Sequence, residues 1–153
     1  MKQYIDECLE QLAIQEKKFN ALYKNVVEFS NIPDCSMWIL YYLIISSDEI
    51  TQQDLVKKML FPKQTINSAV NSLSQKGFVQ LETIPNTKNK KRILLTGIGS
   101  DFAKNTVCKL REAECRAVKN MGKEKMSKFI ELYRELHDEL QKEFMNEGII
   151  NAK

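Results

Sequence analysis

The sequence contains few of the residues that interrupt regular structure, with five glycines and three prolines among 153 residues. So few turn formers exclude a many-turned β-sandwich and a low-complexity linker. The longest apolar run, Met37 to Ile45, is too short to cross a bilayer. Residues 1–7 lack the apolar stretch of a secretory signal peptide. We therefore expect a cytoplasmic protein with no membrane partner.

Motifs of several enzyme and metal-binding classes are also missing. Cys8, Cys35, Cys108 and Cys115 form no C-x-x-C pair, which excludes zinc-ribbon and thioredoxin-like sites, and we expect reduced, mostly buried thiols. There is no glycine-rich phosphate loop, no G-x-S-x-G and no H-E-x-x-H. An exposed position on a helix explains His137, the single histidine, better than a role as catalytic base. The sequence predicts no enzyme activity, no cofactor and no metal.

Positive charge is concentrated in the middle of the chain. Residues 51–92 hold eight basic and two acidic residues, a net charge of +6, whereas the remaining residues carry a net charge of −3. The basic residues of this segment are Lys57, Lys58, Lys63, Lys76, Lys88, Lys90, Lys91 and Arg92. A basic centre between mildly acidic ends is typical of a module that binds a polyanion, although charged runs are often only solvated faces.

Four helices are predicted in the first half of the chain. Apolar residues at helical spacing indicate one long helix over about residues 4–29. A second helix, apolar almost all round and therefore buried, begins at Pro33 with Asp34 as its capping residue and ends before residues 46–48.

Capping signals then predict two shorter helices. Thr51 is a good N-cap for residues 52–59, and Asp54 stands where a capping-box acid belongs. Pro62 suits the first turn of the following helix, which ends at Gly77, a residue type suited to the left-handed position. The result is a pair of short helices connected by a tight turn.

A hairpin and two long helices complete the predicted order. Residues 78–84 alternate as a strand, residues 92–96 form a second strand, and the polar segment 86–91 joins them. Helices are expected at about 99–121 and 123–147. Apolar residues of the last helix follow a spacing close to a heptad, so it needs a partner along much of its length: Met126, Phe129, Tyr133, Leu136, Leu140 and Phe144.

Four segments of this order carry recognisable motifs: Thr51-Gln52-Gln53-Asp54-Leu55-Val56, Lys63-Gln64-Thr65-Ile66-Asn67-Ser68-Ala69-Val70-Asn71-Ser72-Leu73, Lys76-Gly77-Phe78-Val79 and Ile93-Leu94-Leu95-Thr96-Gly97-Ile98-Gly99. With these motifs the sequence resembles the MarR family of bacterial transcription regulators. The resemblance implies a mostly α fold with a small β-hairpin. A winged helix-turn-helix DNA-binding domain at residues 33–98 would be flanked by a dimerisation region made of residues 1–32 and 99–153. One departure is the hairpin tip, 86–91, which lacks the family's Asp-x-Arg motif.

The polar face of the fourth helix and the basic hairpin are the predicted DNA contacts. The helix presents amide, hydroxyl and lysine side chains and has no acid from Pro62 to Lys76, whereas a merely solvated face more often mixes Glu and Lys. Its predicted contacts are Lys63, Gln64, Thr65, Asn67, Ser68 and Asn71. Those of the hairpin, the wing, are Lys88, Lys90, Lys91 and Arg92. The expected partner is a pseudo-palindromic double-stranded operator.

Dimerisation and effector binding complete the hypothesis of a homodimeric repressor. The terminal helices carry apolar stripes too long for one winged domain to cover, and the predicted interface contains Ile5, Leu9, Leu12, Leu136, Leu140 and Phe144. The resemblance implies a pocket for a small aromatic or lipophilic effector. Its predicted lining is the aromatic set Phe19, Tyr23, Trp38, Tyr41 and Tyr42, which could equally be plain core.

Two alternatives stay open at this point. The resemblance also implies a thiol-based redox sensor with the same fold, because Cys8 lies near the position of the reactive cysteine in peroxide-sensing relatives. However, no basic residue follows Cys8 within one turn to lower its pKa. A winged-helix module that binds only proteins would instead favour an acidic or apolar outer face on the 63–76 helix, and the sequence has neither.

Overall fold

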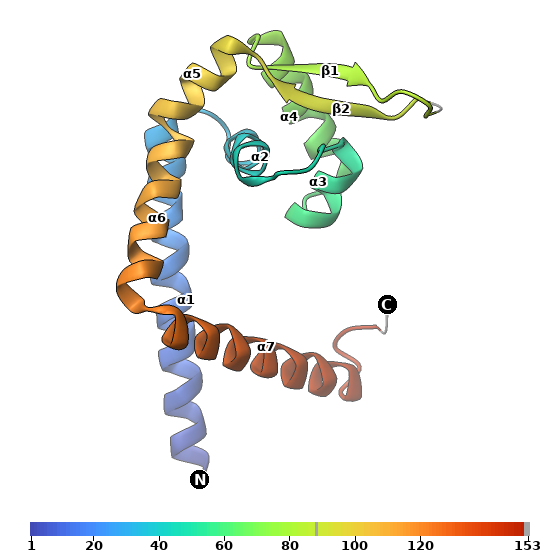
Figure 1. The fold of residues 1–153 in the computed structure, drawn as a ribbon. Helices are drawn as coiled ribbons and strands as arrows, with labels where there is room; N and C mark the ends of the chain where they lie inside the picture. Colours follow the sequence, from blue (N-terminus) through green and yellow to red (C-terminus); the bar gives the residue numbers. More distant parts are fainter. Residues whose placement is uncertain (88, 152–153) are drawn as a thin grey trace. The chain divides into compact units, whose positions relative to one another are not determined.

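The computed structural model describes residues 1–87 and 89–151. The described elements are α1 (Lys2–Ser30), α2 (Asp34–Ile45), α3 (Gln52–Met59), α4 (Lys63–Gln75), β1 (Val79–Thr83), β2 (Lys91–Leu95), α5 (Gly97–Asn105), α6 (Val107–Met121) and α7 (Lys123–Asn146) (Figure 1). The chain divides into two compact units, one of residues 1–111 and one that begins at Glu112, within α6. A mostly α fold with one two-stranded hairpin confirms the predicted fold class.

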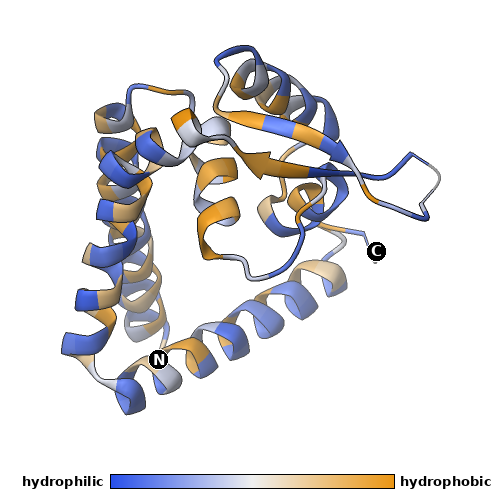
Figure 2. Cartoon of the chain, turned by 45° about the horizontal axis from the view of Figure 1, so that its top comes forward, coloured by the Kyte–Doolittle hydropathy of each residue, from blue (hydrophilic) through white to orange (hydrophobic). Residues whose placement is uncertain are grey.

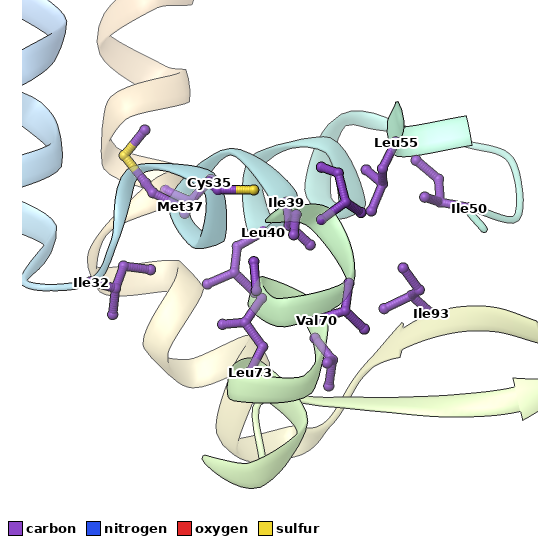
Figure 3. Packing of buried hydrophobic residues seen from close by; sticks show 14 of the residues in the cluster. Ile32, Cys35, Met37, Ile39, Leu40, Ile50, Leu55, Val70, Leu73 and Ile93 are labelled. Atoms are coloured by element: carbon purple, nitrogen blue, oxygen red, sulfur yellow. The ribbon is translucent and has the colours of Figure 1, made fainter. Parts of the chain in front are cut away.

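Helix α2 forms the centre of the first unit, as its sequence predicted. It packs against α1, α3, α4, α5 and β2, and its Ile39 and Leu40 are completely buried. Figure 2 shows this helix coloured hydrophobic along most of its length. Figure 3 shows how its side chains meet those of α3, α4 and β2, among them Leu55, Val70 and Ile93. The core therefore fixes the position of α4 relative to the hairpin.

The loop before α3 pairs with the hairpin through an isolated β-bridge. Strands β1 and β2 are antiparallel, with Leu81 opposite Ile93 and Glu82 opposite Arg92. Thr51 forms a bridge with Arg92, and the amide of Ile93 donates to the carbonyl oxygen of Ile50 over 2.8 Å. This arrangement ties the wing to the helix-turn-helix through the backbone.

The N-terminal ends of α2 and α4 differ from the prediction by one residue. Pro33 and Pro62 occupy the N-cap positions, and neither helix has a side-chain cap. Asp34 is therefore the first helical residue of α2 and not its cap. Its negative charge in the first turn is favourable beside the positive end of the helix.

The predicted single helix over 99–121 is wrong, because Thr106 separates α5 from α6. The Thr106 hydroxyl donates to the carbonyl oxygen of Phe102 over 2.9 Å, and its backbone (φ −122°, ψ −80°) is not helical. Side chains that bond to a nearby carbonyl compete with the regular helical ladder. Helix α5 also begins earlier than predicted, since Thr96 leaves the strand and caps the helix by accepting from the amide of Gly99 over 3.0 Å.

The second unit contains the rest of α6 and α7. No residue of α7 is buried by the described part of the chain, and the Phe129 and Tyr133 rings stack with centroids 5.9 Å apart. His137 is exposed, as predicted, with Nδ1 3.1 Å from a carboxylate oxygen of Asp138. Within the described residues, no helix is both long and apolar enough to cross a membrane.

Candidate nucleic-acid interface

The outer face of α4 displays most of the residues that the sequence assigned to DNA contact. Its inner face is anchored in the core by Ile66, Val70 and Leu73, which are buried almost completely. The exposed residues of the predicted set are Lys63, Gln64, Thr65, Ser68 and Asn71, and Asn67 is half-buried. A rigid helix with amide and hydroxyl groups on its open face has the donors and acceptors needed to contact base edges in a major groove.

The turn after α4 fixes where the wing begins. Gly77 adopts a positive φ of 70°, as expected for the residue after a helix end, and Phe78 donates its amide to Leu73 O over 2.9 Å. The Phe78 ring then stacks on Phe102 of α5 with centroids 4.6 Å apart. The base of the wing is therefore held between α4 and α5.

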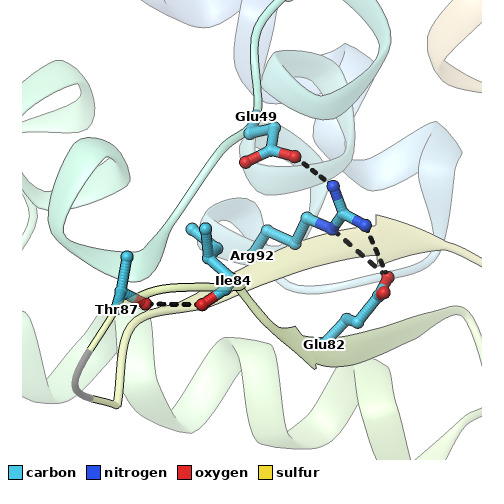
Figure 4. Close-up of polar contacts among 5 residues, drawn as sticks. All are labelled: Glu49, Glu82, Ile84, Thr87 and Arg92. Carbon is cyan, nitrogen blue, oxygen red and sulfur yellow. Dashed lines mark hydrogen bonds and ion pairs between the residues drawn. The ribbon is translucent and has the colours of Figure 1, made fainter.

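Both strands of the wing carry hydrophobic segments, and β2 is hydrophilic at the end nearer the tip (Figure 2). Lys90 and Lys91 are exposed, whereas Lys88, also predicted to contact DNA, lies outside the described residues. The tip turns at Asn86 and Asn89, which both have positive φ, and the Thr87 hydroxyl donates to Ile84 O over 2.7 Å (Figure 4). The tip thus combines a tight turn with positive charge.

A small groove separates the start of α3 from the wing. It has a volume of about 170 Å³ and is lined by Thr51, Gln52, Gln53, Leu81, Asn89, Lys90 and Lys91. Thr51, one of the lining residues, also forms the predicted capping box, in which it exchanges hydrogen bonds with Asp54. Hydrogen bonds from the Thr51 side chain and backbone hold the pKa of Asp54 below its usual value, and the charges of Lys57 and Lys90 lower this pKa further.

Arg92 differs from the wing lysines because its guanidinium is already engaged by Glu49 and Glu82 (Figure 4). Hydrogen bonds to Glu82 and then Glu49 raise the pKa of Arg92 above its usual value. The sequence prediction grouped Arg92 with the lysines because it considered charge along the chain. The two carboxylates, ten and forty-three residues away, become visible as partners only in the fold.

A second feature of the first unit is a pocket of about 650 Å³ between α1 and α2. Its lining includes three of the five predicted aromatic residues, Phe19, Tyr23 and Trp38. Tyr41 and Tyr42 are absent from the lining but extend the same chain of ring contacts, with Trp38 and Tyr41 centroids 5.4 Å apart. The sequence reasoning did not include the charged lining residues Lys24, Glu28 and Asp34.

The predicted interface residues of α1 and α7 remain uncovered in the single chain. Ile5, Leu9, Leu136 and Phe144 are exposed, and Leu12 and Leu140 are half-buried. Exposed apolar side chains at regular helical spacing are a feature of surfaces that bind another protein.

The cysteines are less buried than predicted. All four are free, but Cys35 is the one that is buried, whereas Cys8 and Cys115 are exposed and Cys108 is intermediate. Burial, together with the nearby charge of Asp34, raises the pKa of the Cys35 thiol. The prediction failed for Cys8 and Cys115 because both lie on helices that the chain itself covers poorly. The described residues contain no cluster of His, Cys, Asp and Glu that could hold a metal ion.

Comparison with known proteins finds a family that this arrangement resembles. Residues 30–88, from the end of α1 through the helix-turn-helix and into the wing, match the model of the MarR family. The helix-turn-helix and wing of this chain are similar to the MarR family. No curated protein sequence matches the chain.

Solved structures of MarR family proteins share the fold over nearly the whole chain. The regulator NMB1585 from Neisseria meningitidis superposes with a TM-score of 0.75 at 17% identity, covering 91% of this chain and 97% of its own. Staphylococcus aureus MepR in its DNA-binding conformation gives a TM-score of 0.65 at 21% identity, covering 86% and 96%. S. aureus MarR in complex with salicylate and kanamycin superposes with a TM-score of 0.60 at 20% identity. The match covers 90% of this chain and 93% of that protein.

Proposed function

We propose that this chain is a homodimeric repressor that binds a pseudo-palindromic operator and is released by a small-molecule effector. The observation that carries the proposal is the open face of α4, which is free of carboxylates from Pro62 to Lys76 and stands beside a basic wing. A phosphate backbone favours this charge, and base edges favour amide and hydroxyl groups. The similarity to MepR in its DNA-binding conformation supports the same assignment.

Selection of bound duplexes from a random DNA pool tests the proposal. A homodimer should enrich a pseudo-palindrome whose half-sites lie about 10 base pairs apart centre to centre, or a multiple of that spacing. The matched control is a variant with Gln64→Ala and Asn67→Ala, because it keeps all the basic residues. This variant should enrich no sequence while still binding duplexes at low salt. Enrichment of no sequence by the unchanged protein would refute operator recognition.

The pocket between α1 and α2 supports the effector. Its volume lies in the usual range for small-ligand sites, roughly 300–1,000 Å³, and its aromatic walls suit a flat apolar molecule. The similar S. aureus MarR was solved with salicylate and kanamycin. In this chain Lys24 is already 3.9 Å from Glu28, and Asp34 adds a second carboxylate. The excess of carboxylates over lysine in the pocket lining favours an aromatic effector that is neutral or positively charged.

Trp38 provides a direct measurement, since it is the single tryptophan and lines the pocket. Titration with phenyltrimethylammonium should quench its fluorescence at lower concentration than titration with salicylate. Replacement of Tyr23 by Ala should weaken the response, whereas Tyr133→Ala on α7 should not. Tighter binding of salicylate would contradict the charge argument, and no response to either compound would count against the pocket.

A further inference from the structure

The Arg92 side chain joins three segments of the first unit. Its Nη1 forms an ion pair with Glu49 of the loop between α2 and α3. Its Nε and Nη2 lie 3.2 Å and 3.0 Å from the same carboxylate oxygen of Glu82, which stands opposite Arg92 on β1. Figure 4 shows the guanidinium between the two carboxylates.

The geometry of this contact distinguishes it from an isolated surface ion pair, because one guanidinium joins two carboxylates that are each 49% exposed. Exposed pairs contribute little because water competes for both charges. Here the Arg92 side chain is 26% exposed, and all three of its nitrogens have carboxylate partners. The planar guanidinium can bond in this way to two groups at once, which a lysine ammonium does with less geometric definition. The backbone bond from Ile93 to Ile50 lies beside it, so the contact reinforces the attachment of the wing.

We propose that Arg92 is a positioning residue, which holds the wing in place relative to α3, and that it is not a DNA contact. The inference rests on the proposed function of DNA binding. A phosphate could take the guanidinium only by displacing Glu82 or Glu49. Lys90 and Lys91 lie nearer the tip and line the groove beside α3, so they stay available to contact the DNA phosphate backbone. Arg92 then determines where those two lysines stand.

Neutralising the two carboxylates tests the inference, because a positioning role and a general electrostatic effect predict opposite changes in DNA affinity. In a general electrostatic account, removal of a negative charge near DNA tightens binding to every duplex. If Arg92 positions the wing, Glu49→Gln and Glu82→Gln instead weaken operator binding, which we expect to be about tenfold for the pair. The control Asp48→Asn changes the same charge at an exposed neighbour of Glu49 and should leave binding equal or slightly tighter. Tighter binding by both Glu variants would overturn the inference.

The salt dependence of Arg92→Gln separates positioning from phosphate contact. Loss of one phosphate contact lowers the slope of log K against log salt by about one unit. We expect that result for Lys91→Gln, whereas Arg92→Gln should weaken operator binding with the slope unchanged. Arg92→Lys should restore part of the affinity at most. A slope lowered by one unit in Arg92→Gln would assign the residue to DNA contact and overturn the inference.

Hydrogen exchange of the free protein tests the same inference without DNA. In Arg92→Gln, amides of β1 and β2 should exchange at least fivefold faster, while the core amides of α4 keep their rates and show that the domain is folded. Unchanged exchange in the hairpin would overturn the positioning role. If the unchanged protein binds no operator, the proposed function fails. The exchange measurement then still decides whether Arg92 holds the wing.

Discussion

The carbonyl oxygen of Phe78 lies 1.8 Å from the point where a Cβ atom on Gly99 would stand. This close approach arises because Thr96 binds the same turn, donating its amide to Phe78 O over 3.0 Å and its hydroxyl to Gly77 O. The first turn of α5 is thereby pressed against the segment that connects α4 to β1. No side chain larger than a hydrogen atom fits at position 99 without displacing backbone.

Gly99→Ala should therefore destabilise the domain. Overpacking of a filled site costs about 1–3 kcal/mol, and here the neighbour is backbone, which moves less easily than a side chain. Chemical denaturation monitored by circular dichroism measures the change. Gly97→Ala is the matched control, because a Cβ there meets nothing within 4 Å and alanine favours the helix by roughly 0.5–1 kcal/mol. Equal stability of the two variants would contradict the proposed steric cause.

The capping box of α3 should make a contribution to stability that depends on pH. Thr51→Ala removes the acceptor for the Asp54 amide and the donor to its carboxylate, at a cost of about 1 kcal/mol near neutral pH. The pKa of Asp54 is lowered in the folded protein, so the stability that its carboxylate contributes is fully present above the unfolded pKa. This contribution is lost as the pH falls through the lower, folded pKa.

Urea denaturation of the unchanged protein and of Thr51→Ala at pH 7 and pH 3 measures this difference. The gap between the two free energies of unfolding should shrink at pH 3. Comparison within one pH removes the effect of the other carboxylates, which are common to both proteins. A gap that stays constant or grows in acid would show that the hydroxyl acts without the Asp54 charge.

Local signals in the sequence were sufficient for most of the helix-turn-helix. The capping box of Thr51 with Asp54 marked the beginning of α3 correctly, and Gly77 marked the end of α4. The alternation of apolar residues likewise identified the hairpin, in which Val79 of β1 and Ile93 of β2 are buried in the core.

Features that depend on contacts between distant segments could not be predicted in this way. The engagement of Arg92 by Glu49 requires the loop before α3 to lie beside β2, which no local pattern reveals. Leu60 adopts a positive φ of 57° in the turn between α3 and α4 although leucine has no preference for that region. The requirement for glycine at position 99 becomes visible only in the fold, where the Phe78 carbonyl lies next to it.

The apolar seam of α7 should be covered by a second copy of the chain. Leu136→Asp or Leu140→Asp would place a charge in that seam, at a cost on the order of several kcal/mol of association. Sedimentation should find a dimer for the unchanged protein at micromolar concentration and a monomer for these variants. Lys142→Asp, an exposed change on the same helix, is the control and should remain dimeric. A monomeric unchanged protein would end the homodimer hypothesis.

The amide side chains of α4 should carry sequence preference. Gln64→Ala and Asn67→Ala should each lose about 1–3 kcal/mol of binding to the selected operator and much less to random duplex. Gln75→Ala, exposed at the other end of the same helix, should change neither affinity. Binding titrations against both duplexes measure the difference. If the first two variants bind operator as well as the unchanged protein, α4 does not contact the bases.

The wing lysines should increase the affinity for DNA without adding preference for any DNA sequence. Lys90 and Lys91 are exposed beside the groove, and a lysine that neutralises a phosphate contributes equally to every sequence. Lys90→Gln and Lys91→Gln should therefore weaken operator and random duplex by similar factors and lower the salt slope by about one unit each. Lys125→Gln on α7, with the same change of charge far along the chain, should leave the slope unchanged. If the wing variants abolish operator preference while Asn67→Ala keeps it, specificity arises from DNA shape sensed by the wing.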